Sequence, residues 1–153
     1  MSKDNDLKSG LSATGIKTVA ATIYAAAANQ DDKMMQYVGS TLLNRLESGK
    51  AEFGADDGSI DKVIMTGYYE KNSELYKDFM LGKFKDDASK KSALRAASIA
   101  SALTRGTIER MPGEFWFTDD EVNNLKKNRQ FNFKAVKELD GVGKKGQFRT
   151  FAY

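Results

Sequence analysis

Carboxylates are the side chains of this chain best suited to acid–base chemistry. The 153 residues include 21 aspartates and glutamates, but no histidine and no cysteine. Histidine-based triads, thiol nucleophiles, disulfides and zinc sites built on thiolates or imidazoles are therefore excluded. What remains is chemistry that a carboxyl group can do alone, such as protonating the leaving oxygen of a glycosidic bond.

Paired aspartates occur at four places in the sequence. They fall where helix N-caps or loops are expected, and none has the spacing of a calcium-binding loop. We therefore predict no metal and no cofactor. The pairs are Asp31-Asp32, Asp56-Asp57, Asp86-Asp87 and Asp119-Asp120.

Hydrophobic periodicity predicts the helices that must position any functional group. Apolar residues recur on one face, aspartate, serine or asparagine stands at the starts, and glycine follows the ends. In the fourth helix Leu75, Phe79 and Met80 are expected to face inward, and in the fifth Leu94 is expected in the buried face with Ala97, Ile99, Ala100 and Leu103. The predicted helices cover residues 15–27, 32–49, 59–67, 72–82 and 88–105.

The last third of the chain changes character at Pro112-Gly113. Residues 114–118 are predicted as a strand, and Asp119-Asp120 as the cap of a short helix that ends near Lys127. Two more strands, 131–139 and 147–153, are predicted around a glycine-rich connection. The expected fold is a mostly helical α+β domain over residues 15–153, with a small C-terminal β-sheet and a flexible arm at 1–14. Neither a signal peptide nor a membrane-spanning segment is expected.

Two segments of the first and second predicted helices resemble the spore-cortex-lytic (SleB-type) cell-wall hydrolases. Tyr24-Ala25-Ala26-Ala27 stands where that family has Tyr-Ala-Glu-Ala, and residues 38–45 end in Asn44-Arg45, as the family's second helix does. Weaker similarity follows in the same order at 60–67, 93–106, 115–117 and 147–153. The resemblance covers roughly residues 21–153 and implies a lysozyme-like domain.

The activity implied by the resemblance is cleavage of the MurNAc-GlcNAc glycan strands of peptidoglycan. Such an enzyme is a lytic transglycosylase or a muramidase, and it uses one glutamate as general acid. By position that glutamate corresponds to Ala26, and no carboxylate occurs between Asp6 and Asp31. Proton transfer is worth about 10²–10⁴-fold in rate, so the chain is expected to be catalytically inactive. The alanine is engineered, or natural in a domain that binds glycan without cutting it, or only a good helix former in a chance alignment.

The other expected site residues are polar or aromatic. Asn44 and Arg45 either face the cleft or form a polar helix end, and Tyr24 either hydrogen-bonds at the cleft or packs with its hydroxyl at the surface. Strand alternation places Trp116 on the face opposite Phe115 and Phe117. The full substrate-binding set is Tyr24, Asn44, Arg45, Tyr68, Tyr69, Trp116, Thr118 and Tyr153.

The remaining carboxylates offer weak substitutes for the missing glutamate. Glu70 follows the two tyrosines and Glu114 begins the aromatic strand, so either could reach a groove. Nothing in the sequence distinguishes them from surface charges, and Glu47 is expected to be solvated.

Peptidoglycan glycan strands are the expected partner, and we expect a monomer. Residues 126–153 hold eight basic and two acidic side chains, with aromatics between them. That mixture also suits single-stranded nucleic acid, although the aromatics alternate as in a strand core, which disfavours this reading. The short chain without an export signal suggests a phage lysin or virion-associated enzyme, in the virion or the infected host's cytoplasm, acting on the periplasmic wall. The rival interpretation is a non-catalytic peptidoglycan-binding or structural phage protein.

Overall fold

The computed structural model describes residues 11–139 and 149–153, with the side chain of Tyr69 left out. These residues form a mostly helical α+β fold, as the sequence predicts. The glycine-rich connection predicted at 140–146 and most of the expected N-terminal arm lie outside the described residues. The helices are α1 (Ala13–Ala27), α2 (Asp32–Ser48), α3 (Ile60–Gly67), α4 (Glu74–Leu81), α5 (Asp87–Arg105) and α6 (Asp119–Lys127). The 3₁₀ turns are η1 (Ala51–Phe53), η2 (Tyr69–Asn72) and η3 (Phe133–Ala135), and the strands are β2 (Phe115–Phe117), β3 (Lys137–Glu138) and β4 (Arg149–Ala152).

Short polar side chains fix the starts of the helices. The Asp31 carboxylate accepts a hydrogen bond from the Met34 backbone N–H at 3.0 Å, and Ser59 caps α3 in the same way. At the other ends, Gly49, Gly82 and Gly106 adopt the left-handed conformation that ends a helix without steric cost. These caps explain why the predicted helix boundaries agree closely with the structure.

Several boundaries differ because a neighbouring residue is the true cap. Ser12 caps α1, so residues 13 and 14 are helical and not part of the expected arm. Ser73, and not Asn72, caps α4. Thr118, and not Asp119-Asp120, caps α6, in a capping box with Glu121. The strand predicted at 131–139 is only η3 followed by the two residues of β3.

The predicted inward faces of α4 and α5 are partly wrong. Leu94 is 69% exposed and Leu75 is 37% exposed. The buried face of α5 is instead lined by small residues such as Ala93, Ala96 and Ala100. The cause is packing: α5 lies along α1, itself rich in alanine, and small side chains allow that close approach.

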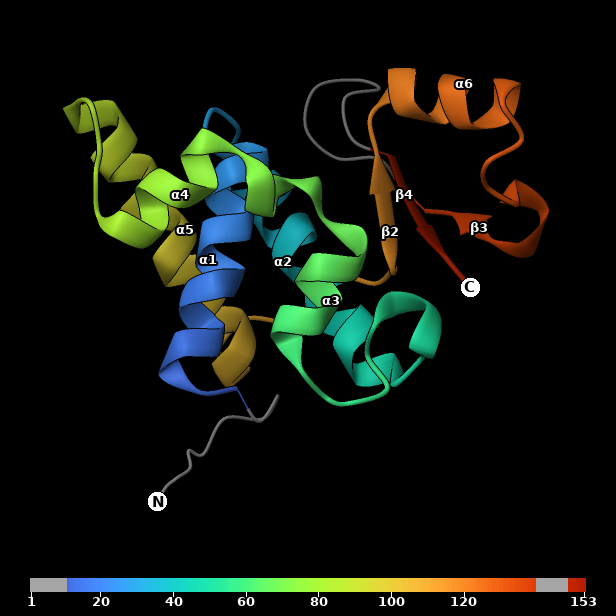
Figure 1. The fold of residues 1–153 in the computed structure, drawn as a ribbon, viewed down its shortest axis with the longest axis horizontal. Helices are drawn as coiled ribbons and strands as arrows, with labels where there is room; N and C mark the ends of the chain where they lie inside the picture. Colours follow the sequence, from blue (N-terminus) through green and yellow to red (C-terminus); the bar gives the residue numbers. More distant parts are fainter. Residues whose placement is uncertain (1–10, 140–148) are drawn as a thin grey trace.

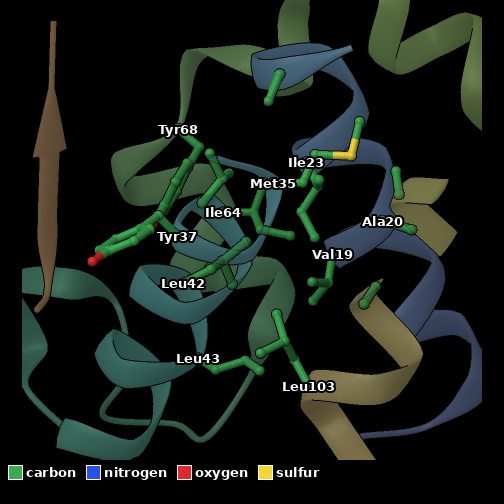
Figure 2. Packing of buried hydrophobic residues seen from close by; sticks show 14 of the residues in the cluster. Val19, Ala20, Ile23, Met35, Tyr37, Leu42, Leu43, Ile64, Tyr68 and Leu103 are labelled. Atoms are coloured by element: carbon green, nitrogen blue, oxygen red, sulfur yellow. The ribbon is translucent and has the colours of Figure 1, made fainter. Parts of the chain in front are cut away.

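Helix α1 lies at the centre of the helical part and packs against α2, α4 and α5. In Figure 2, Val19 and Ile23 of α1 meet Met35 of α2 in this core. Gly39 of α2 packs tightly against α5 and α1, because a Cβ there would lie 2.7 Å from Leu103 and 2.9 Å from Ile23. The central helix is therefore held rigidly on three sides.

The sheet has the strand order β2-β4-β3, and both strand pairs are antiparallel. Figure 1 shows the sheet and α6 together at one end of the long axis, with α1 to α5 toward the other. Phe115 pairs with Phe151 across β2 and β4. Arg149 of β4 binds Glu138 of β3 with two hydrogen bonds of 2.8 and 2.9 Å. Among the described helices, none has the length and apolar character needed to cross a bilayer.

Candidate functional site

A pocket of about 250 Å³ opens where the helical part meets β2 and α6. It combines aromatic faces, two carboxylates and a guanidinium, which is an unusual mixture for a plain surface depression. Three of the sequence-predicted site residues, Arg45, Tyr68 and Trp116, come together here. The full lining is Arg45, Gly67, Tyr68, Glu70, Trp116, Phe117, Glu121, Asn124 and Leu125.

Arg45 forms the inner wall of the pocket and is only 9% exposed. Its guanidinium carbon lies 5.0 Å from the ring centres of Phe53 and Tyr68 and 5.2 Å from that of Phe115. Its Nε donates a 2.5 Å hydrogen bond to the Glu114 carbonyl. Gly67 leaves room beside it, because a side chain at that position would displace the Arg45 guanidinium. Aromatic faces thus hold this buried cation at the pocket wall.

Asn44 holds the segment that leads into β2 and does not line the pocket. Its side-chain amide donates to the carbonyls of Met111 and Gly113, both at 2.8 Å. Ser40, one turn earlier on α2, accepts a 3.0 Å hydrogen bond from the Met111 N–H. Together with the Arg45 bond to Glu114, these contacts clamp the start of β2 onto α2. The Asn-Arg pair singled out by the resemblance therefore positions the aromatic strand.

Trp116 lies beside a hydrogen bond that runs into α2. Burial raises the pKa of the Tyr68 hydroxyl, and the Trp116 side chain next to it is the smallest of the effects that oppose this rise. Tyr68 Oη lies 3.1 Å from Thr41 Oγ1, and Thr41 Oγ1 lies 2.9 Å from the Val38 carbonyl. Since Thr41 gives its one proton to that carbonyl, Tyr68 donates to Thr41. Tyr68 is buried, so it supports Trp116 more than it offers a face of its own.

Glu70 and Glu121 are the two carboxylates of the pocket. Burial raises the pKa of the Glu70 carboxyl, the negative charge of Glu121 raises it further, and Arg45 opposes the shift. Glu121 is held by the capping box, where its Oε1 accepts a 2.9 Å hydrogen bond from the Thr118 N–H. The pocket therefore contains one carboxyl group that retains its proton at higher pH than an ordinary glutamate, beside a second, positioned one.

The residues predicted on the first helix lie apart from this pocket. Tyr24 is 2% exposed and packs against Phe79 and Phe84 with ring centres 5.6 and 5.8 Å away, so its ring belongs to the core. Ala26 is partly buried against the same core and does not line the pocket. The side chain of Tyr69 lies outside the described residues.

The remaining predicted residues have other roles. Thr118 caps α6 and so positions Glu121. Tyr153 donates from its hydroxyl to Glu52 at 2.8 Å, with Lys50 Nζ 3.9 Å from its ring centre, away from the pocket. Phe115 is buried, as expected for one face of the strand, while Phe117 shares the pocket with Trp116.

Sequence reasoning missed the contribution of α6. The helix was predicted, but nothing marked Glu121, Asn124 and Leu125 as pocket residues. The available signal was their i, i+3, i+4 spacing, which places them on one helix face. Among the residues that the structure describes, no group of three acidic side chains is arranged to hold a metal ion.

Comparison with family models, with curated proteins and with solved structures gave no match. The function of the chain is therefore inferred from the pocket itself and from the sequence resemblance.

Proposed function

We propose that this chain binds the glycan strands of peptidoglycan in the pocket between α2, η2, β2 and α6. The observation that carries the proposal is that the indole of Trp116 lines one pocket together with Glu70, Glu121 and Arg45. Aromatic faces suit the apolar C–H face of a sugar ring, and carboxylates, amides and guanidinium groups suit its hydroxyls. The resemblance to SleB-type hydrolases supports the same ligand class.

Rigidity of the pocket supports a binding role. Trp116 lies against the buried Tyr68, and the start of β2 is clamped by Asn44 and Arg45. A platform that is already ordered loses little side-chain entropy when ligand binds. The pocket can therefore hold a weakly interacting ligand such as a sugar with few contacts.

Ala26 determines how the chain differs from the enzymes it resembles. A methyl group cannot protonate a glycosidic oxygen, so α1 supplies no acid. The function proposed here, glycan binding, does not need one. It includes the rival interpretation from the sequence, a non-catalytic wall-binding protein.

Sedimentation with purified, protein-free peptidoglycan tests the proposal. We expect the chain to pellet with the polymer and Trp116→Ala to bind about tenfold more weakly, which corresponds to about 1.4 kcal/mol. The matched control is Phe133→Ala, an aromatic of η3 that lies outside the pocket. Equal binding by the parent and Trp116→Ala would remove the pocket from the proposal.

A parallel titration with a single-stranded oligonucleotide separates the glycan from nucleic acid. Affinity for a nucleic acid falls steeply with salt, because bound cations are released from phosphates. We expect peptidoglycan binding to vary little between low and high salt. Tight, salt-sensitive binding of the oligonucleotide with no binding of peptidoglycan would overturn the proposal.

A further inference from the structure

We propose that Glu70 is the general acid of a glycan-cleaving site in this pocket. It would take the place of the glutamate that the resemblance leads us to expect at position 26, where this chain has alanine. This inference depends on the proposed function, because it assumes that a glycan strand occupies the pocket. It differs from the expectation drawn from the sequence, which places the acid on the first helix and predicts an inactive chain.

The main chain around Glu70 is well fixed. Its carbonyl accepts hydrogen bonds from the Ser73 N–H at 2.9 Å and the Ser73 hydroxyl at 2.7 Å, which joins η2 to the N-cap of α4. The turn η2 also packs against α1, the helix on which the resemblance places the acid. Glu70, which lines the pocket, therefore stands on an element adjoining that helix.

The surroundings of Glu70 favour its protonated form. The charged groups that act on it are Glu121 of α6 and Arg45 of α2, and it in turn acts on Tyr68. Partial burial raises the pKa of Glu70 most, and the like charge of Glu121 adds to the effect. A carboxylic acid that stays protonated closer to neutral pH is what protonation of a leaving oxygen requires.

Arg45 gives an independent sign that the pocket is built for a polar ligand. The side chain is more than nine-tenths buried, lines the pocket, and has no carboxylate within ion-pair distance among the described residues. Its hydrogen bond to the Glu114 carbonyl uses Nε and leaves the two Nη groups for other acceptors. A sugar hydroxyl or ring substituent in the pocket would supply them.

The reaction needs only the glycan, one carboxyl group and water. The Glu70 proton passes to the glycosidic oxygen while the bond from the anomeric carbon to that oxygen breaks, and the bonding electrons stay on the oxygen. A water molecule, or the 6-hydroxyl of the same sugar, then bonds to the positively charged anomeric carbon. Its proton goes to the Glu70 carboxylate, which restores the acid. The Glu121 carboxylate, held by the Thr118 N–H, lies in the same pocket and stabilises the positive charge.

The test is release of soluble fragments from purified peptidoglycan, measured by mass spectrometry. The full chain is compared with Glu70→Gln and with Glu109→Gln, an exposed glutamate outside this pocket. We expect the parent and Glu109→Gln to release disaccharide-peptides at similar rates. The rate of release by Glu70→Gln should be lower than that of the parent by about 100-fold or more. Glu70→Gln should still bind peptidoglycan, with a loss of at most about tenfold, because the glutamine amide keeps the shape of the side chain and can still hydrogen-bond a sugar hydroxyl.

A second variant and a pH profile distinguish the loss of a catalytic group from the misfolding of a variant. Glu70→Asp keeps the carboxyl group and should cleave slowly but measurably, with circular dichroism confirming the fold of each variant. Cleavage by the parent should decline as the pH rises past the raised pKa of Glu70, because the acid must hold a proton. Cleavage by Glu70→Gln at the parental rate would overturn the inference.

The remaining outcomes separate this inference from the proposed function. A parent that binds peptidoglycan but releases no fragments would overturn the role of Glu70 and leave glycan binding intact. A parent that neither binds nor cleaves would overturn both.

Discussion

The Tyr68 hydroxyl donates a hydrogen bond to Thr41 Oγ1 over 3.1 Å, and the Trp116 side chain lies beside that hydroxyl. Thr41 is fully buried and Tyr68 is 4% exposed, so this chain runs from the pocket into the protein interior. Trp116 is therefore oriented by α2, a helix that its own strand contacts directly. The relationship makes the binding face of the pocket depend on a buried threonine.

Tyr68→Phe should disturb both stability and the pocket. It leaves the buried Thr41 hydroxyl without one partner and removes the hydroxyl that lies beside Trp116, and an unsatisfied buried group costs about 1–3 kcal/mol. We expect the free energy of unfolding in urea to fall by about that amount. Because Trp116 is the one tryptophan of the chain, its fluorescence should also shift.

Tyr76→Phe serves as the control for this prediction, since Tyr76 is partly exposed on α4 and does not line the pocket. If both variants unfold and fluoresce like the parent, the hydrogen-bond chain does not fix Trp116.

Arg45→Lys should destabilise the protein although it keeps the charge. Lysine lacks the planar group that stacks on Phe53, Tyr68 and Phe115, and lacks the Nε that donates to Glu114. We expect the free energy of unfolding to fall by about 1.5–3 kcal/mol, the usual range for a hydrogen bond to a charged group.

The exposed Arg105, in the last turn of α5, provides the matched control for the Arg45 variant. Arg105→Lys should unfold at the same urea concentration as the parent. Equal losses of unfolding free energy in the two variants would mean that the rings of Phe53, Tyr68 and Phe115 do not favour guanidinium over ammonium.

The contrast between caps and faces explains what the sequence could predict. Helix ends are local, so Ser59, Gly82 and Gly106 locate them within a residue or two. Which face of a helix is buried depends on the partner helix. The sequence pattern therefore predicts a buried Leu94, whereas α5 packs through its alanines and leaves Leu94 exposed.

The site was predictable to the same limited extent. Strand alternation left either Trp116 or the Phe115 and Phe117 pair to face a groove, and the structure places both Trp116 and Phe117 in the pocket. Arg45 was marked by the resemblance, and Tyr68 was one of two adjacent aromatic residues in the expected binding set. The environment of Glu70 could not be predicted from the sequence. It arises because η2 packs on α1 and α6 approaches the same pocket, and these are contacts between segments far apart in the sequence.

Gly39→Ala should overpack the centre of the core. The added methyl would lie under 3 Å from Leu103 and Ile23, and such overpacking costs about 1–3 kcal/mol. Leu103→Ala alone should cost about 2–5 kcal/mol by leaving a cavity.

Combined, the two core substitutions should cost less than the sum of the single variants, because the truncated side chain makes room for the methyl. Urea unfolding of all four proteins gives the coupling energy. Strict additivity would show that α1, α2 and α5 do not meet at Gly39.

Glu70→Gln should change how stability depends on pH. Because burial raises the folded-state pKa of Glu70 above its unfolded value, the folded state binds this proton more tightly. Its contribution to stability is fully present below the unfolded pKa and is lost as the pH rises through the folded pKa.

We therefore expect the stability of the parent, relative to Glu70→Gln, to decline with rising pH over that window. Glu138 works in the opposite sense, since Arg149 lowers its pKa, but it is common to both proteins and cancels in the difference. A difference that is flat with pH would show that Glu70 is fully solvated.

Ala26→Glu decides between two positions for the acid. Ala26 is partly buried against the core and does not line the pocket. If Glu70 is the acid, a carboxylate at position 26 adds no cleavage, and the variant should release peptidoglycan fragments at the parental rate or below it.

The experiment compares the parent, Ala26→Glu and Ala26→Gln, with glutamine as the control for the bulk of the longer side chain. Fragment release by Ala26→Glu alone would mean that the first helix holds the acid position, as the resemblance implies. It would overturn the role of Glu70 and leave glycan binding as the native function of the chain. Release by the parent and Ala26→Glu alike, and its loss in Glu70→Gln, would place the acid on η2.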